Sequence, residues 1–447
     1  YTLTFYAKTK NSSKFSYSMQ GWTAQRNYID TGTQSWKEYS TSYTTGAEEY
    51  NLEILFVSSG KADEIYIDDI SIQQDGENII QNGDFEDTHI YASEHFQANA
   101  SAIRNKVVRV LDDAKKNNVM VNVLISPHYF PEWILNEYPQ ANQIDCGLGY
   151  NINEPIIQEA LELYIEVLMN EIKNHDSLHS ICLTNEPKCN TRNQKDLLAE
   201  YANYLEEVHG NIDTLNSIYG TTYLNFSDVP MPESDTMDAA YYDWVQFNNR
   251  YTANWNRYLA ELVKKYAPDV ATHAKIMTIF GNSDSLNYGI DPEDFAEFTD
   301  YSGNDAWGFY GKDASGLVSK LAWYDLLKSI KPESPIINSE DHIIEDRNVN
   351  YTEKQAIHVA ADTWQGAVHG RDASIIWIWG RTKNQSADTY GNILYRPDVL
   401  SAVGKKSLDL NRLSKQISVL QKAESKVSIM LRFVNPKSGC SLAASRF

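Results

Sequence analysis

Basic residues are scarce in this sequence, and their scarcity limits what the protein can bind. The chain holds 39 Lys and Arg against 60 Asp and Glu, which gives a net charge of −21 at pH 7. Nucleic acids and anionic membrane surfaces are bound through a basic footprint, so we expect neither as a partner. We also expect no membrane span, because no apolar run approaches the roughly 20 residues that one requires.

Cysteine is scarce as well. The cysteines at positions 146, 182, 189 and 440 are too few for a disulfide scaffold and do not have the spacing of a zinc site. Cys182 stands inside an apolar run and is expected in the core. Cys146 and Cys189 each follow a predicted strand, and whether they form a disulfide between neighbouring loops stays open.

Motifs of several other enzyme classes are missing. The sequence has no P-loop motif, no complete GxGxxG, no GxSxG and no HExxH. We therefore expect no cofactor, no metal and no serine-esterase chemistry. Aromatic side chains, by contrast, are abundant, with 29 Tyr and 10 Trp. Such rings stack on sugar faces and pack sheet surfaces equally well, so their number does not decide between the two.

The first 73 residues or so have the pattern of an antiparallel, jelly-roll-like β-sandwich. Apolar and polar residues alternate in strand-length segments, and clusters of Asn, Gly, Ser and Thr separate them. The chain opens directly on a strand-like segment, as it would after removal of a leader, and we expect an extracellular or periplasmic location. The predicted strands are Tyr1–Ala7, Lys14–Met19, Trp36–Tyr43, Tyr50–Val57 and Glu64–Ile72.

From about residue 100 the pattern changes to helices that alternate with strands. This alternation predicts a parallel sheet wrapped by helices, and we expect an α/β fold with a (β/α)8 TIM barrel after the sandwich. The predicted domains are the sandwich at 1–87, the barrel at 88–425 and a tail at 426–447. The recognisable barrel strands are Val119–Ile125, Leu178–Pro187, Thr272–Phe280, Tyr301–Tyr310, Pro335–Glu340 and Ser374–Trp379.

A closed barrel needs two further strands before residue 100, where only His89–Tyr91 has strand character. Either the sequence lacks a stretch between about 87 and 100, or the barrel is irregular. We favour the first alternative, because a half-open barrel would expose an apolar sheet edge.

Two of the barrel strands end in a carboxylate. Glu186 follows Leu178–Asn185 and precedes Pro187, which cannot extend a strand's hydrogen-bond ladder, and Glu340 follows Pro335–Ser339. A Glu at a strand end is often a solvated loop residue or a salt-bridge partner. Barrel enzymes, however, keep their chemistry at the carboxyl ends of their strands. One acid that protonates a leaving oxygen and one ionised carboxylate are the minimal equipment of a glycosidase.

Several stretches together carry a family resemblance. They are Ile125-Ser126-Pro127, Pro131-Glu132-Trp133, Thr184-Asn185-Glu186, His209-Gly210-Asn211-Ile212-Asp213-Thr214-Leu215-Asn216, Tyr219-Gly220-Thr221, Asp305-Ala306-Trp307 and Asn338-Ser339-Glu340. Through them, residues roughly 100 to 430 resemble the clan A glycoside hydrolases, most closely the family 42 β-galactosidases.

The resemblance assigns roles to three residues. It implies that Glu186 is the general acid/base, that Glu340 is the nucleophile and that Asn185 hydrogen-bonds the 2-hydroxyl of the sugar. Family 42 commonly has Tyr-Gly after the acid/base pair, where this sequence has Pro187-Lys188. Galactose specificity therefore stays open.

Other side chains are candidates for substrate binding. Clan A members use a Trp as the floor of the sugar site, and Trp379 is preferred here over Trp377 because it lies nearer the barrel mouth. His342 is expected at the nucleophile or the substrate, whereas its neighbour Asp341 is expected in a salt bridge. The remaining candidates, chosen by position alone, are His128, Trp307 and Tyr310, followed by His273, Lys275 and Asp305.

The N-terminal domain resembles carbohydrate-binding modules of the family 4/9 type. The matching stretches are Trp36-Lys37-Glu38-Tyr39-Ser40, the segment Ile65–Ile72 and Asn82-Gly83-Asp84-Phe85-Glu86. No exposed aromatic pair can be identified from the spacing of its residues. We therefore expect the domain to serve as a structural brace rather than to bind carbohydrate.

These observations predict a retaining glycoside hydrolase that cleaves β-linked glycosides by double displacement, with β-galactosidase as one activity in that class. An alternative is an endo-acting hydrolase of an algal or plant β-linked galactan or glucan. A non-catalytic carbohydrate-binding protein is a further alternative, which the presence of both acids disfavours. The expected partner is in each case a carbohydrate, and the sequence does not indicate an oligomeric state.

Overall fold

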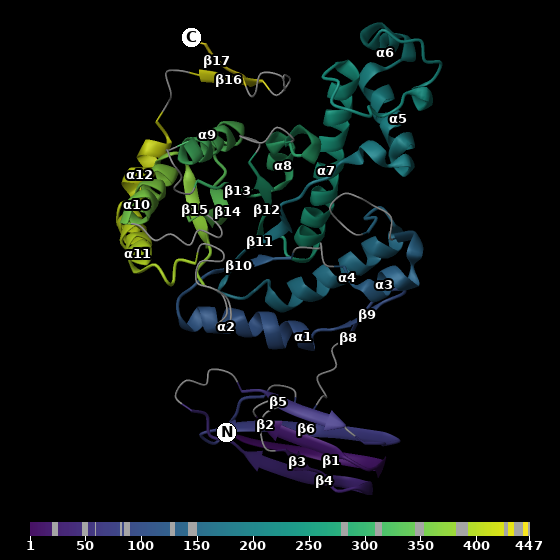
Figure 1. The fold of residues 1–447 in the computed structure, drawn as a ribbon, viewed down its shortest axis with the longest axis vertical. Helices are drawn as coiled ribbons and strands as arrows, with labels where there is room; N and C mark the ends of the chain where they lie inside the picture. Colours follow the sequence, from purple (N-terminus) through teal and green to yellow (C-terminus); the bar gives the residue numbers. More distant parts are fainter. Residues whose placement is uncertain are drawn as a thin grey trace. The chain divides into compact units, whose positions relative to one another are not determined.

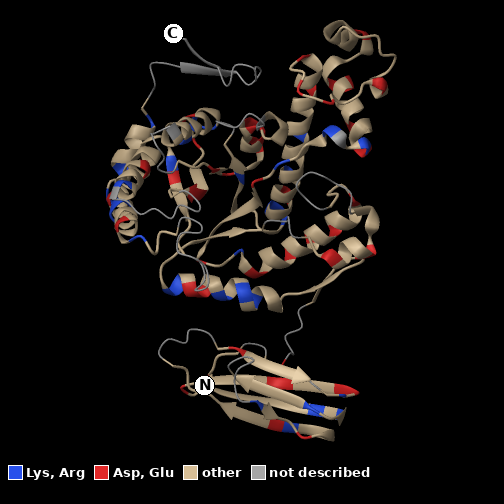
Figure 2. Cartoon of the chain, in the orientation of Figure 1, with Lys and Arg blue, Asp and Glu red and all other residues tan. Residues whose placement is uncertain are grey.

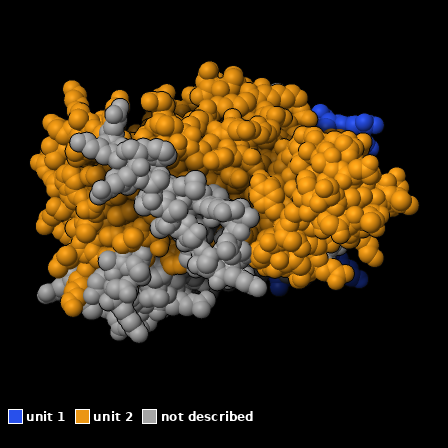
Figure 3. All heavy atoms as spheres, turned by 90° about the horizontal axis from the view of Figure 1, so that it is seen from above, with its two compact units in different colours: residues 1–110 blue, residues 111–447 orange. Residues whose placement is uncertain are grey.

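The chain divides into two compact units, residues 1–110 and 111–447 (Figure 3). The computed structural model describes residues 1–19, 26–46, 52–58, 60–80, 83–84, 90–125, 130–141, 150–278, 285–308, 315–344, 353–380, 392–423, 428–432 and 441–445. Cys146, His128 and Tyr310 lie outside this set. Each unit has its own sheets, so the two are described separately.

The first unit contains the predicted sandwich. One sheet has the order β4 (Gly32–Ser42), β1 (Thr2–Ser12), β6 (Glu64–Gln74) and β7 (Glu77–Asn78). The other has the order β3 (Asn27–Tyr28), β2 (Phe15–Met19) and β5 (Ile54–Ser58), and all pairs in both sheets are antiparallel. Alternate residues of β1 and β2 fill the space between the sheets, with the rings of Phe5 and Tyr17 4.8 Å apart.

An exposed aromatic pair lies on the four-stranded sheet. Trp36 on β4 and Tyr66 on β6 are each 47% exposed, and their ring centroids are 6.5 Å apart. The Lys8 ammonium lies 5.6 Å from the centroid of the Tyr66 ring. The spacing of residues in the sequence did not reveal this pair. The strands β4 and β6 are far apart along the chain, and only the sheet brings them together, on either side of β1.

The second unit is built on six parallel strands whose order in the sheet follows the sequence. Helices cover the outside of this sheet, as Figure 1 shows for α7, α9 and α10. Strands in sequence order with helices outside are the arrangement of a (β/α)8 barrel. The strands are β10 (Val121–Leu124), β11 (Leu178–Asn185), β12 (Ala271–Met277), β13 (Ser302–Asp305), β14 (Ile336–His342) and β15 (Arg371–Trp377).

The six strands that the sequence predicted are therefore confirmed. The two further strands expected before residue 100 are not part of this sheet among the described residues. There, β8 (Ile90–Ala92) and β9 (Gln97–Asn99) form an antiparallel sheet of their own. Strands β10 and β15 consequently form the two edges of the sheet that the described residues build.

The helices follow the predicted rhythm. The long α4 and α7 each bury an apolar face, and α9 and α10 pack on the strands that carry the second acid. Figure 2 shows basic and acidic residues interspersed along α2. None of the helices in the described part of the chain has the length and apolar character that crossing a membrane requires. The helices are α1 (Ser101–Ile103), α2 (Arg109–Lys116), α3 (Glu132–Glu137), α4 (Pro155–Ile172), α5 (Leu198–His209), α6 (Ile212–Tyr219), α7 (Ala239–Tyr266), α8 (Pro292–Phe298), α9 (Ser315–Ile330), α10 (Glu353–Val368), α11 (Pro397–Arg412) and α12 (Ser414–Gln421), and a last antiparallel pair is β16 (Ser428–Arg432) with β17 (Ser441–Ser445).

Candidate active site

An irregularity in strand register lies just before Glu186 and another includes Glu340. On β11, Cys182 pairs with His273 and Asn185 with Lys275, so three steps along β11 oppose two along β12. On β14, Asn338 pairs with Ser374 and Asp341 with Ile376, which again gives three steps against two. One extra residue of this kind is a β-bulge, which re-aims the side chains that follow it. The side-chain direction of both acids is thus set by local backbone geometry.

Lys275 joins the two strand ends. Its Nζ donates to Oε2 of Glu340 at 2.5 Å and to Oδ1 of Asn185 at 2.7 Å. Lys275 is 6% exposed and Glu340 is 7% exposed. A charged Lys at this depth requires a carboxylate partner, and Glu340 supplies it. Asn185 and Glu340, which the sequence predicted in one site, therefore meet through a shared ammonium group.

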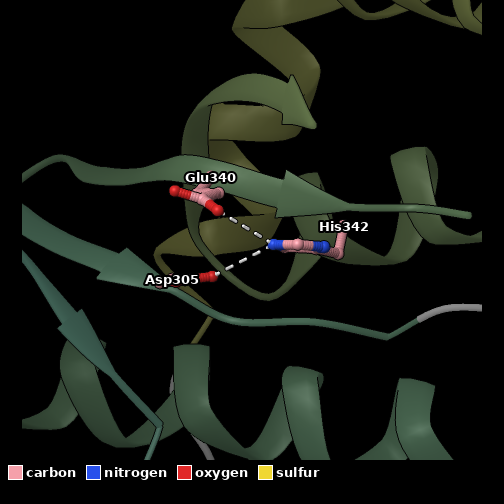
Figure 4. Close-up of side chains that lie close together, drawn as sticks. All are labelled: Asp305, Glu340 and His342. Carbon is pink, nitrogen blue, oxygen red and sulfur yellow. Dashed lines mark hydrogen bonds and ion pairs between the residues drawn. The ribbon is translucent and has the colours of Figure 1, made fainter. Parts of the chain in front are cut away.

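His342 is the second partner of Glu340. Its Nε2 lies 3.2 Å from Oε1 of Glu340, and Figure 4 shows both side chains on β14 directed to the same space. Burial alone would raise the pKa of Glu340, but the hydrogen bonds from His342 and Lys275 outweigh it and hold the pKa below its ordinary value. Glu340 is therefore an ionised carboxylate at neutral pH, and His342 lies at the acid as predicted.

Asp305, at the end of β13, is a third carboxyl in this cluster. It is 4% exposed, and its Oδ1 lies 3.8 Å from Nε2 of His342 (Figure 4). Burial raises the pKa of Asp305 to about 9, with further contributions from the charges of Glu340 and Glu186. A hydrogen bond between Asp305 and Glu186 contributes as well. Three carboxyls from three strand ends therefore converge here, and Asp305 is protonated at neutral pH.

Glu186 adopts a left-handed backbone conformation. Its φ is +46°, and its N–H donates to the carbonyl oxygen of Lys275 at 2.9 Å. For a residue with a Cβ this conformation costs about 1–2 kcal/mol, and such residues are concentrated at functional sites. The turn directs the Glu186 side chain to Asp305 immediately before Pro187 ends the strand.

Asp341 points away from this cluster. It belongs to a buried ion cluster of Lys320, Asp341, Asp362 and Arg371 between β14, β15, α9 and α10. Nη1 of Arg371 lies 2.6 Å from Oδ2 of Asp341, which also accepts from Ser374 at 2.6 Å. The prediction that Asp341 forms a salt bridge is confirmed. That its partners are buried could not be predicted from the sequence.

The aromatic candidates divide between two positions. The ring of Trp377 lies 5.8 Å from that of His342 and is partly buried. Trp379 is 58% exposed and Trp307, two residues beyond Asp305, is also exposed. Trp377 is therefore the better candidate for the floor of a sugar site, while the role predicted for Trp379 stays a prediction. His128 and Tyr310 lie outside the described residues.

His273 and Cys182, which were also singled out from the sequence, are both buried. Burial, with the charges of His179 and Lys275, lowers the pKa of His273 to about 3, so its ring is neutral. Cys182 is a free thiol whose pKa burial raises to about 12, as expected of a core residue. Cys189 forms a disulfide. Because Cys146 lies outside the described residues, the pairing of Cys146 with Cys189 stays open.

A metal ion is one conceivable occupant of the cluster. Ligand atoms of Asp305, Glu340 and His342 lie within 4.8 Å of one another. However, the ammonium group of Lys275 already contacts Glu340 at 2.5 Å and supplies the positive charge that this carboxylate requires. We therefore interpret the group as a cluster of carboxyls organised by protein cations.

Comparison with known proteins gives a consistent result. A family model described as β-galactosidase, glycoside hydrolase family 42, matches residues 104–417. No curated protein sequence matches significantly. Among solved structures, an exo-carrageenase of family 42 from Bacteroides ovatus has 24% identity and a TM-score of 0.58 over 70% of this chain and 47% of its own.

Two β-galactosidases have similar folds. The cold-adapted enzyme from Rahnella sp. R3 has 16% identity and a TM-score of 0.56, over 75% of this chain and 51% of its own. The enzyme from Bacillus circulans sp. alkalophilus has 14% identity and a TM-score of 0.55, over 70% and 49%. The chain thus spans about half the length of these structures, and at such identities the likeness establishes the barrel fold alone.

Proposed function

Since the chain belongs to the β-galactosidase family of glycoside hydrolases, family 42, we propose that it hydrolyses β-linked glycosides with retention of configuration. The observation that carries this proposal is the state of Glu340. It is a buried carboxylate that Lys275 and His342 keep ionised at a barrel strand end. An ionised, oriented carboxylate is what nucleophilic attack on an anomeric carbon requires.

In the first step Glu340 attacks the anomeric carbon while Glu186 protonates the departing oxygen. The bond from carbon to the leaving group breaks as the bond to Glu340 forms, which gives a glycosyl-enzyme ester. Lys275 and His342 contact both oxygens of Glu340, but each oxygen keeps a second lone pair for the attack. In the second step Glu186 takes a proton from water, which displaces Glu340.

Asn185 is arranged to hold the sugar. Its Oδ1 accepts from Lys275 at 2.7 Å, so its Nδ2 group is left to donate to the substrate. A donor to the 2-hydroxyl oxygen at this position strengthens its hydrogen bond as charge develops in the transition state. Trp377, next to His342, would pack against the sugar ring.

The charges favour a neutral glycoside, and the family makes a β-galactoside the first candidate. Lys275 and His342 are both engaged by Glu340, and the whole chain carries a charge of −21. A sulfated sugar would need a cation of its own. The family likeness to an exo-carrageenase nevertheless makes an algal β-linked galactan the second candidate.

Product stereochemistry tests the proposal. Purified protein is incubated with aryl β-galactoside, β-glucoside, β-mannoside and β-xyloside and with soluble galactans, and the first anomer released is identified by proton NMR. We expect the β-anomer from a galactoside. Release of the α-anomer would contradict retention, and hydrolysis of none of these substrates would contradict the proposed activity.

A further inference from the structure

Asp305 holds an oxygen atom that has no partner. Its Oδ1 is buried and accepts no hydrogen bond from any residue that the structure describes. The nearest donor, Nε2 of His342, lies 3.8 Å away, which is beyond hydrogen-bond distance. A buried carboxylate oxygen without a donor is costly, because the charge has lost its water and gained nothing in return. Burying an oxygen of a neutral carboxylic acid without a hydrogen-bond donor costs much less free energy than burying one of a carboxylate.

The groups that face Asp305 also favour the neutral acid. Glu340 approaches from β14 with a negative charge, and Glu186, from the end of β11, is a second carboxyl that becomes negative whenever it gives up its proton. Lys275 on β12 brings positive charge, but its ammonium group donates to Glu340, and His342 on β14 likewise directs its Nε2 to Glu340. The donors of the site therefore serve the nucleophile, and Asp305 is left between two carboxyls.

On the basis of the proposed function, we infer that Asp305 is a positioning residue that acts through Glu186, holding its own proton and donating it in a hydrogen bond to that side chain. Only one of two adjoining carboxyls can supply the hydrogen of the bond that joins them. The buried and unpartnered Asp305 is the one that retains a proton. Glu186, half-buried and next to the substrate, keeps its other oxygen for the leaving group.

This hydrogen bond serves both chemical steps. When Glu186 gives its proton to the departing oxygen, it becomes an anion, and the O–H of Asp305 remains bonded to it. The bond becomes charge-assisted at that moment and is therefore stronger in the transition state than before it. When water is deprotonated in the second step, the proton goes to Glu186, and Asp305 keeps its own throughout.

Two substitutions of similar size separate this role from the alternatives. Asp305→Asn replaces the acid O–H by an amide N–H that can still donate, whereas Asp305→Leu removes the donor. We expect kcat/KM of the Asn variant to stay within about tenfold of the parent and that of the Leu variant to fall by about 10²–10³-fold, the usual loss for one transition-state donor. The alkaline limb of the pH profile should stay in place for Asn and move to higher pH for Leu, because the anion of Glu186 loses its donor.

Either of two results would overturn the inference. If Asp305→Asn is as impaired as Asp305→Leu, the residue acts as an anion that accepts from substrate or a cation. If Asp305→Leu has parental activity and an unmoved alkaline limb, the residue positions nothing.

Infrared spectroscopy tests the proton without activity. In the full chain at pH 7, the difference spectrum between the parent and Asp305→Asn should show loss of one C=O band of a protonated carboxyl, distinct from the band that Glu186→Gln removes. Asp300→Asn is the matched control, because Asp300 precedes the same strand and its carboxylate contacts Lys264 at 2.8 Å. An unchanged band in Asp305→Asn would overturn the inference even if the protein hydrolysed no substrate, whereas loss of the band in an inactive protein would count against the proposed function alone.

Discussion

Replacing Lys275 by Met should convert Glu340 from a carboxylate held ionised into one that resists ionisation. The substitution keeps the length of the side chain but removes the charge that lies 2.5 Å from Oε2. Two unit charges about 4 Å apart interact by about 4 kcal/mol at an effective dielectric constant of about 20, which corresponds to roughly 3 pKa units. Since His342 remains as a donor at 3.2 Å, we expect the pKa of Glu340 to rise from its lowered position without reaching that of a buried carboxyl that has no partner.

The assay is the pH dependence of kcat/KM on an aryl β-galactoside. The acid limb reports the ionisation of the nucleophile in the free enzyme, so it should move to higher pH in Lys275→Met. An acid limb that stays in place would refute the reasoning, whatever happens to the plateau.

Stability should follow the same titration. In the parent the pKa of Glu340 is lowered by folding, so its contribution is present above the unfolded pKa and is lost as pH falls through the folded pKa. In Lys275→Met the folded pKa is raised, and stability is lost as pH rises instead. The difference between the two proteins in denaturant unfolding should therefore grow from pH 4 to pH 7, toward about 3–5 kcal/mol.

The control variant is Lys320→Met. It removes a buried ammonium from the buried ion cluster and so has a comparable cost in stability, yet it should leave the acid limb in place. If that variant does not fold, Lys264→Met removes the partner of Asp300 at the surface and should change neither quantity by much.

Further predictions concern the acids, the indoles and the first unit. Glu186→Ala should slow hydrolysis most for substrates with poor leaving groups. Azide should partly restore the activity of this variant and yield a β-glycosyl azide, which NMR identifies; an α-glycosyl azide would point to inversion. Asp341→Asn should lower the free energy of unfolding by about 3–5 kcal/mol in urea, because it leaves Lys320 and Arg371 short of a counter-charge, and a loss below 1 kcal/mol would contradict this. Trp377→Ala should raise KM about tenfold or more and Trp379→Ala should not; the reverse order would restore Trp379 as the floor of the sugar site. If the first unit is a brace, Trp36→Ala should leave migration of the full chain through polysaccharide gels unchanged, and loss of retardation would show that it binds.

The sequence predicted well wherever periodicity carries the information. The strands Leu178–Asn185 and Ile336–His342 and the helices between them follow from apolar runs and helical spacing, and these place both acids at one edge of the sheet. Which side chains contact each other at the strand ends could not be predicted in the same way. Lys275 and Asp305 stood at plausible positions, but contacts between strand ends depend on register, which a single sequence does not contain.

Side-chain direction was the second limit. Strict alternation along β14 would place Glu340 on the same face as Asn338, which contacts Tyr324 in the helix layer. The bulge breaks that alternation, and no residue type in the segment allows the bulge to be predicted. Side-chain direction also decides between the two indoles. The sequence favoured Trp379 over Trp377 as the floor of the sugar site because of its position along the strand, whereas the contact with His342 favours Trp377.

The bulge on β14 decides which side of the sheet Glu340 and Asp341 face, and the two carboxylates have different roles. Glu340 faces Lys275, and Asp341, one residue later, faces Lys320 and Arg371. Both find basic partners ready on their own side of the sheet. Deleting Ser339 would move the following chain back by one step and bring Asp341 to the place of Glu340. The shorter Asp side chain would reach less far toward a sugar, and His342 would take the place of Asp341, which leaves Lys320 and Arg371 without that carboxylate. A single-codon deletion would thus disturb both groups of charges at once without changing the charge of the chain, so inactivation at this strand can arise from a change of register rather than from loss of an acid.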